Sequence, residues 1–299
     1  MDSVTETKVQ IASLEGISRK PFSYWQLVGY RLRRDNITLA AAAVILLVIA
    51  SAVFAPLVSP YDPNRGNIRA RLAPLGTPGH FLGTDELGRD MFSRLLHGGR
   101  LSLLGGLAPV FVSLVIGSFL GVVAGYLGGR VNMAIMRTID IFYAFPSVLL
   151  AIAISGALGA GLENTIISLS IVFIPPVTRV AESITTQVRG FEFVEAAQAS
   201  GANSVEIIRY HILTNVLSTI FVYTTNLVSL SIILASGLSF LGLGVSPPLA
   251  EWGLMLNTLR QSIYVNAWVP ALPGVMIFIT SMTFNLLSDG LRDAMDVRL

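Results

Sequence analysis

The chain has 299 residues, of which 53% are hydrophobic and only 13% are charged. A soluble domain carries about 25% charged residues, so this composition indicates a protein that lies largely in lipid. The net charge is only +2 and the basic residues are scattered, which argues against a nucleic-acid-binding protein. The sequence contains no cysteine, which excludes disulfides, thiolate metal sites and cysteine nucleophiles.

Charge-free runs predict the membrane spans, because a helix needs about 20 apolar residues to cross the bilayer core. Six such runs occur, at 37–59, 101–129, 141–162, 164–178, 212–250 and 261–288. The fourth is short and contains Pro175 and Pro176, so we expect its helix to continue through Arg179 toward Ser183. The fifth is too long for one span and should end near Gly244. The predicted fold class is all-α, a polytopic membrane protein with about six transmembrane helices.

The segments between the runs divide the chain. We expect an N-terminal tail at 1–36, a first span at 37–59, an external loop at 60–100, a five-helix core at 101–288 with a second external loop at 245–268, and a C-terminal tail at 289–299. The first run has 23 residues after a polar tail, whereas signal-peptide cores have about 7 to 15, so it predicts a retained anchor.

The orientation follows from the distribution of lysine and arginine. With six spans, thirteen of these residues lie on the side of both termini and seven lie on the other side. The positive-inside rule therefore predicts that both termini are cytoplasmic.

One charged segment interrupts the apolar runs of the core, within the loop 179–215. Its seven charged residues would each cost about 2.5 to 3.5 kcal/mol in hydrocarbon, and they are Arg179, Glu182, Arg189, Glu192, Glu195, Glu206 and Arg209. This loop must therefore lie in water or against another protein, and the predicted orientation places it in the cytoplasm.

The local sequence of this loop predicts two short helices separated by Gly201. The second should begin at Asn203, whose side chain can accept a backbone N–H, with Glu206 in the capping-box position. It should be amphipathic, because apolar residues recur at helical spacing at Val205, Ile208 and Ile212.

This loop resembles that of the integral membrane permeases of binding-protein-dependent ABC importers, which carries Glu-Ala-Ala, three residues and then Gly. The matching residues here are Glu195, Ala196, Ala197 and Gly201. These permeases usually end the second short helix with Leu-Pro, whereas Leu213 is followed here by Thr214.

Three further motifs narrow the resemblance to the peptide and nickel permeases of the type with an extended first external loop. They are FLGTDELGRD at 81–90, LSFLGLG at 238–244 followed by Pro-Pro and Glu-Trp-Gly up to residue 253, and NLL with DGLRD at 285–293. Together the resemblance covers most of residues 30–298.

The resemblance implies the architecture of a type I ABC importer permease in the inner membrane, with no catalytic residue, metal or cofactor of its own. The implied partners are a second homologous permease forming a heterodimer, two ATPase subunits and an extracytoplasmic binding protein. The implied solute is a dipeptide or oligopeptide, with nickel or glutathione as alternatives. The residues expected to couple to the ATPase are Glu195, Ala196, Ala197, Gly201, Asn203 and Glu206.

Two other sets of residues are candidates for function. The external-loop signature either contacts the binding protein or partner permease, or only ties the loop together, and its residues are Gly83, Thr84, Asp85, Gly88, Arg89 and Asp90. Polar residues inside spans are candidates for the translocation path, and they are Asn226, Ser229, Ser236 and Asn285. Apolar residues from Trp252 to Ile263 predict an amphipathic helix on the outer face, either gating the outer mouth or anchoring at the interface.

The main competing function is a self-sufficient secondary transporter or channel. It predicts an ion-coupling carboxylate in the middle of a span, and no run contains one. An enzyme or metal site has less support, because His80, His97 and His211 have no carboxylate partner at helical ligand spacing. The transported solute does not follow from the sequence.

Overall fold

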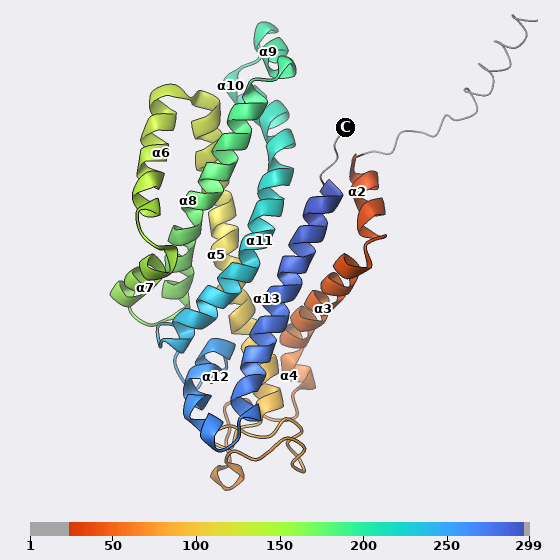
Figure 1. Ribbon diagram of the computed structural model, residues 1–299, viewed down its shortest axis with the longest axis vertical. Helices are drawn as coiled ribbons and strands as arrows, with labels where there is room; N and C mark the ends of the chain where they lie inside the picture. Colours follow the sequence, from red (N-terminus) through yellow and green to blue (C-terminus); the bar gives the residue numbers. More distant parts are fainter. Residues whose placement is uncertain (1–23, 296–299) are drawn as a thin grey trace, which may run out of the picture.

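The computed structural model describes residues 24–295, so parts of both expected tails, 1–23 and 296–299, lie outside the described residues. Within the described range the chain forms helices and no strand (Figure 1). The α-helices are α2 (Tyr24–Leu32), α3 (Asn36–Val53), α4 (Ala55–Val58), α5 (Met91–Leu127), α6 (Gly129–Tyr143), α7 (Ser147–Leu158), α8 (Leu162–Arg189), α9 (Glu192–Ala199), α10 (Ser204–Glu206), α11 (Leu213–Phe240), α12 (Trp252–Leu259) and α13 (Trp268–Met295). Two short 3₁₀ turns, η1 (Ile68–Ala70) and η3 (Arg260–Tyr264), and a π-helical segment, η2 (Ile207–Ile212), complete the list.

Five helical segments of the described chain are long and apolar enough to cross a membrane, and they contain α3, α5, α8, α11 and α13. The pair α6 and α7 passes the same test when taken together, but its two helices are bent by 87°. The bend lies just before Pro146, whose missing backbone N–H prevents α6 from continuing. The run expected over 141–162 is therefore not one continuous helix, because it begins inside α6 and continues through the break into α7.

The boundaries of the first external loop and the last span also differ from expectation. The loop ends at Asp90 and not at residue 100, because the Asp90 side chain caps α5 by accepting the Ser93 N–H. The last span begins at Trp268, where the expected external loop 245–268 ends, but it continues as helix through 289–295, which the sequence places in the tail. Helix α8 runs unbroken from Leu162 to Arg189, past the two prolines and beyond Arg179.

Close packing of α5 on α8 forms the centre of the bundle. Small residues repeat every four positions along α5 at Gly117, Gly121 and Gly125, which places them on one face. A Cβ atom on Gly121 would lie 2.5 Å from both the Ala181 Cβ and the Thr178 carbonyl oxygen. Only glycine therefore allows the two helices to approach this closely.

Helix α12 packs into the bundle rather than lying on its outer face. Trp252, Met255 and Leu259 are each only 1% exposed, and the Trp252 indole N–H donates to the Leu95 carbonyl at 3.0 Å. The buried Glu251 carboxylate caps α12 and also accepts a hydrogen bond from a hydroxyl of α5. The helix expected here is present, but the burial of these three residues in the core does not fit an interfacial anchor.

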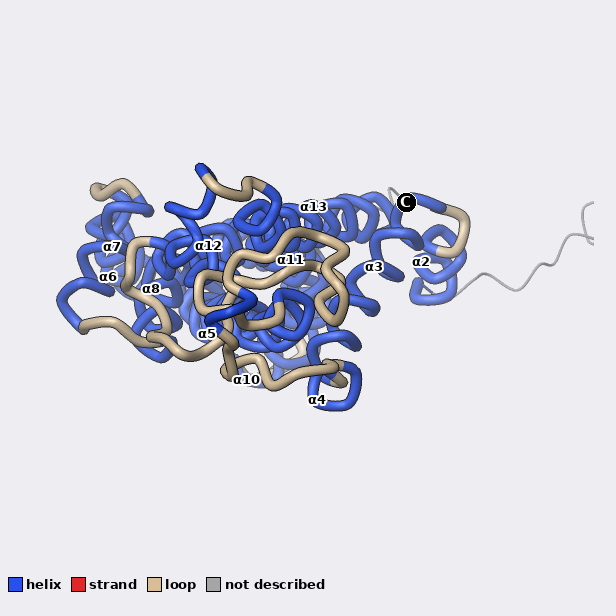
Figure 2. Tube along the Cα trace, turned by 90° about the horizontal axis from the view of Figure 1, so that it is seen from below, coloured by secondary structure: helices blue, strands red, loops and turns tan. Residues whose placement is uncertain are grey.

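The two ends of the bundle are built differently. Helices α9 and α10 lie at one end, together with the end of α13 and the beginning of α2 (Figure 1). The loop 60–90 and α12 lie at the opposite end, and Figure 2 shows how the irregular segments gather over it. The two candidate loops are therefore separated by the length of the spans.

Candidate functional site

Helix α9 ends in a turn that requires Gly201. The Gly201 N–H donates to the Gln198 carbonyl at 3.0 Å, and the Ala202 N–H donates to the Ala197 carbonyl at 3.1 Å. This pair of bonds defines a Schellman motif, in which the residue after the cap adopts a left-handed conformation. Gly201 has φ +85°, as the motif demands. The expected break between two helices is thus made by this residue.

The second helix begins as predicted but does not remain a separate amphipathic helix. Asn203 and Glu206 form a complete capping box. Helix α10 then leads through η2 directly into α11, so the motif loop and the span are continuous. The expected apolar face is partly wrong, because Val205 is 73% exposed and the buried residues are Ile207 and Ile212. The π winding of η2 rotates the buried face relative to an α-helix.

The outer surface of α9 is available to another protein. Glu195 and Ala196 are exposed, and Ala197 is partly buried against the core. Val194 is fully buried, which anchors the helix from its other side. A negative charge and a small side chain on a firmly held helix form a suitable contact surface, because a small residue lets a partner approach closely.

A patch of exposed aromatic side chains extends this surface. Phe191 and Phe193 are 44% and 41% exposed, and their ring centroids are 5.8 Å apart. Tyr210 of η2 is 61% exposed. Exposed aromatic residues of this kind are typical of protein interfaces. The sequence motif did not indicate these residues, although two phenylalanines in a charged loop were a usable signal.

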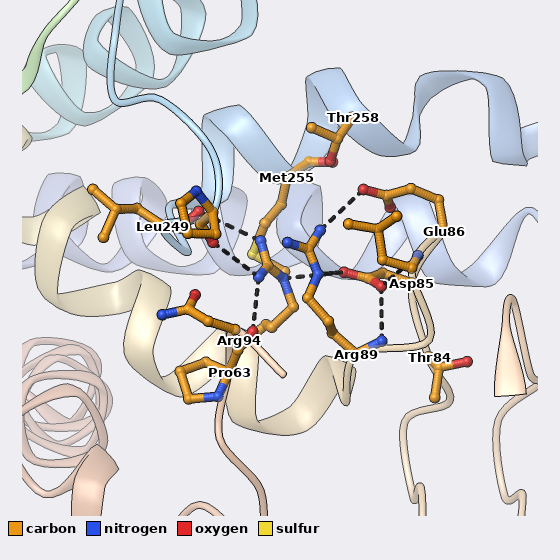
Figure 3. Close-up of polar contacts among 12 residues, drawn as sticks. Pro63, Thr84, Asp85, Glu86, Arg89, Arg94, Leu249, Met255 and Thr258 are labelled. Carbon is orange, nitrogen blue, oxygen red and sulfur yellow. Dashed lines mark hydrogen bonds and ion pairs between the residues drawn. The ribbon is translucent and has the colours of Figure 1, made fainter. Parts of the chain in front are cut away.

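The external-loop signature forms a buried cluster of charges (Figure 3). The Arg89 Nε lies 2.5 Å from the Asp85 Oδ2, and an Nη of Arg89 lies 3.0 Å from the Glu86 carboxylate. The Asp85 Oδ1 also accepts the backbone N–H groups of Leu87 and Arg89, each at 2.9 Å. Asp85 and Arg89 are only 1% and 3% exposed, so each neutralises the other away from water.

Arg94 joins this cluster to two other segments, and sequence reasoning missed it as a functional residue. Its Nε lies 3.3 Å from Asp85, and one Nη donates to the Pro63 carbonyl at 2.8 Å. Its guanidinium also donates to the carbonyls of Pro248 and Leu249, both at 3.4 Å (Figure 3). Arg94 is 2% exposed. It therefore ties the first external loop, α5 and the segment before α12 together.

The remaining residues of the signature shape the same loop. Thr84 is fully buried and bonds to the backbone at Ala70 and Ala73. Gly83 and Gly88 both have positive φ, and a Cβ atom on Gly88 would lie 1.8 Å from the Asn67 carbonyl oxygen. All six residues of the signature are buried, so a direct contact with a partner does not fit the structure. Their geometry supports the other alternative, that they hold the loop together.

His80 has a carboxylate neighbour that lies ten residues away in the sequence, so a search for carboxylates at helical spacing does not find it. Its Nδ1 lies 3.0 Å from the Asp90 Oδ1, and its ring lies 4.9 Å from that of Tyr61. Asp90 also caps α5 through Ser93. This pair is part of the same folded loop, where it links a turn to the first residue of a helix.

The candidates for a translocation path do not gather at one place. Asn226 lines a cavity of about 720 Å³ between α8, α11 and α13, at the end of the bundle where α9 lies. Ser229 bonds to its own helix at the Asn226 carbonyl, whereas Ser236 is buried beside α12 and Asn285 is exposed outside the cavity. The polar lining also includes residues that the sequence did not indicate, namely Ser218, Thr219, Tyr223, Asp289, Arg292 and Asp293.

Comparison with protein families matches two models to the chain. Residues 117–299 match the model described as "Binding-protein-dependent transport system inner membrane component". Residues 23–74 match the model described as "N-terminal TM domain of oligopeptide transport permease C". The first match covers more than half of the chain and includes the whole loop from α9 to α11.

Curated relatives extend the similarity over nearly the whole chain. The glutathione transport system permease protein GsiD of Pectobacterium atrosepticum is 40% identical over 293 residues, which cover 98% of this chain and 97% of the relative. The di/tripeptide transport system permease protein DppC of Pseudomonas aeruginosa is 42% identical, with coverage of 92% and 91%. The probable D,D-dipeptide transport system permease protein DdpC of Escherichia coli is 39% identical, and 89% of each chain is covered.

Among solved structures, the fold is similar to a chain of the inward-facing MetNI methionine ABC transporter. The TM-score is 0.56 at 19% identity, covering 68% of this chain and 97% of that chain. At this identity the comparison shows the fold alone, and that fold is the one of an ABC importer permease.

Proposed function

Because this chain belongs to the family of binding-protein-dependent transport system inner membrane components, we propose that it forms half of an ATP-driven path for peptides. The chain is a multi-pass membrane protein and a permease subunit of an ABC importer. The single observation that carries the proposal is the motif loop: Glu195 and Ala196 lie exposed on α9, which a buried Val194 and a Schellman turn hold firmly.

The proposed partners follow from this role. A second homologous permease completes the path, two ATPase subunits bind the loops formed by α9 and α10, and an extracytoplasmic binding protein delivers the solute. ATP hydrolysis is assigned to the ATPase subunits, so the chain itself is a transport component without catalytic residues. In this proposal Glu195 contacts the ATPase, Ala196 and Ala197 allow close approach, and Gly201, Asn203 and Glu206 give the loop its shape.

The proposed orientation places α9, α10 and both termini in the cytoplasm. The excess of arginine and lysine on that side supports it, as does the position of α9 beside the ends of α2 and α13 (Figure 1). Loop 60–90 and α12 then face the outside, where the buried charge cluster around Arg94 keeps the loop that faces the binding protein rigid.

The proposed solute is a short peptide, because the relatives include permeases named for glutathione, dipeptides and tripeptides. A peptide carries an ammonium, a carboxylate and amide groups. The cavity next to Asn226 offers carboxylates, a guanidinium and hydroxyls at the cytoplasmic end of the proposed path. We propose Asn226 as a path residue on this basis, and Ser229, Ser236 and Asn285 have no comparable support.

The alternative of a self-sufficient secondary transporter or channel is not favoured by the relatives, which are permeases of transport systems. The two functions also differ in a simple experiment. We expect the tagged chain, extracted from its native membrane in mild detergent, to co-purify with a second permease and an ATPase. Recovery of the chain alone with full transport activity after reconstitution would contradict the proposed function.

A further inference from the structure

The joint between α10 and α11 is wound differently from the helices on either side. The six residues Ile207–Ile212 form a π-helical segment directly before α11. The Leu213 N–H closes it by donating to the Ile208 carbonyl, five residues back instead of the four of an α-helix. A π turn is in effect a helix with one extra residue, and such turns occur frequently at functional sites.

Two side chains in the first turn of α11 bond back to this segment. The Thr214 hydroxyl donates to the Tyr210 carbonyl at 2.9 Å and to the His211 carbonyl at 3.4 Å. The Asn215 Nδ2 donates to the His211 carbonyl at 2.7 Å. Back-bonding of this kind competes with the regular ladder of a helix and bends it. Thr214 and Asn215 thus give carbonyls of the π-helical segment a side-chain donor, and both lie on the exposed side of the helix.

The π-helical segment is also packed together with α9. Val194 of α9 and Ile207 and Ile212 of the segment are at most 1% exposed and belong to one hydrophobic cluster. On the surface the rings of Phe193 and His211 lie 6.2 Å apart. A displacement of α9 is therefore passed to the segment, and the segment leads without a break into α11.

We propose that Thr214 and Asn215 are positioning residues that fix the π winding and thereby set the angle between α9 and α11. The inference rests on the proposed function, in which movement of an ATPase reaches the spans through α9. The extra residue of a π turn can shift along a helix by exchanging one hydrogen bond at a time. The two side chains hold it at Ile207–Ile212, so that α9 and α11 move together as one lever.

The test uses the double variant Thr214→Val and Asn215→Ala in the complex purified with its partner subunits. Valine keeps the shape of threonine but lacks the hydroxyl. Uptake of a labelled dipeptide and ATP hydrolysis are measured in the same proteoliposomes. We expect about fivefold less uptake per ATP, the effect of losing roughly one net hydrogen bond. Thr214→Ser should retain the wild-type ratio, because it keeps the donor.

A distance measurement separates positioning from simple loss of stability. The chain has no cysteine, so spin labels at Gln198→Cys in α9 and Leu217→Cys in α11 are the only ones that this chain carries. We expect the distance distribution to broaden in the double variant. The matched control is Thr283→Val, which removes hydroxyl bonds to Ile279 and Thr280 in the α-wound α13 and should change neither uptake nor distances.

The possible results distinguish this inference from the proposed function. Wild-type uptake per ATP with an unchanged distance distribution in the double variant would overturn the inference, and so would an equal loss in Thr283→Val. If the double variant does not assemble, Thr214→Val alone is judged by the same two measurements. If the wild-type complex shows no ATP-driven uptake, the proposed function fails, while the distance measurement still decides whether the two side chains fix the joint.

Discussion

Replacing Arg94 by methionine is expected to destabilise the folded protein by about 3 to 5 kcal/mol, as found when one partner of a buried ion pair is removed. Methionine fills much of the same space but leaves the carbonyls of Pro63, Pro248 and Leu249 without their donor. It also removes one of the two cations that neutralise Asp85. Thermal unfolding of the purified protein in detergent measures the effect.

Two further variants give this prediction its controls. Arg94→Lys keeps the charge but loses the planar fork that reaches three segments, so we expect an intermediate loss of stability. Arg69→Met removes an exposed arginine of the same loop and should leave the unfolding temperature unchanged. If Arg94→Met unfolds at the wild-type temperature, Arg94 does not hold this end of the bundle together.

Replacing Glu195 by lysine is expected to lower ATP-driven uptake by at least about tenfold while leaving the chain folded. Glu195 is exposed on α9 and forms no ion pair within the described residues. Reversing its charge should therefore change the stability of the chain itself very little. At an interface, loss of a close charge pair is worth about 1.5 kcal/mol or more, which corresponds to a tenfold change. Uptake and ATP hydrolysis measured together reveal the uncoupling.

The controls separate the charge of this loop from its shape. Glu163→Lys makes the same charge change at the opposite end of α8 and should leave uptake unaltered. Gly201→Val places a β-branched residue at φ +85° and should also uncouple transport, whereas Gly201→Asn should not, because asparagine tolerates this conformation. If the Glu195→Lys protein takes up as much solute per ATP as the wild type, α9 is not the contact with the ATPase.

The sequence was sufficient to predict what depends on local patterns. Charge-free runs indicate the spans because the cost of burying charge in lipid is large, and the caps at Asn203 and Gly201 follow from backbone requirements alone. The Glu-Ala-Ala-Gly spacing predicted the family. In these cases one short segment contains all of the interacting atoms.

The features that the sequence did not reveal depend on contacts between distant segments. Arg94 bonds to residues more than 150 positions away, as its contacts with Pro248 and Leu249 show. The burial of Trp252 depends on glycines of α5 that leave room for its ring. The π winding of η2 depends on a balance between backbone and side-chain hydrogen bonds. The spacing of apolar residues alone predicted that Val205 lies on the buried face, whereas it is exposed.

The most direct test of the central claim is ATP-driven uptake by the purified complex. The permease is reconstituted with its co-purifying subunits in proteoliposomes that enclose ATP, with binding protein and a labelled dipeptide outside. We expect the dipeptide to accumulate only when both ATP hydrolysis and the binding protein are present. In the Glu195→Lys complex this accumulation should fall by at least about tenfold while hydrolysis continues. Accumulation that proceeds without ATP, driven by an ion gradient alone, would contradict the account.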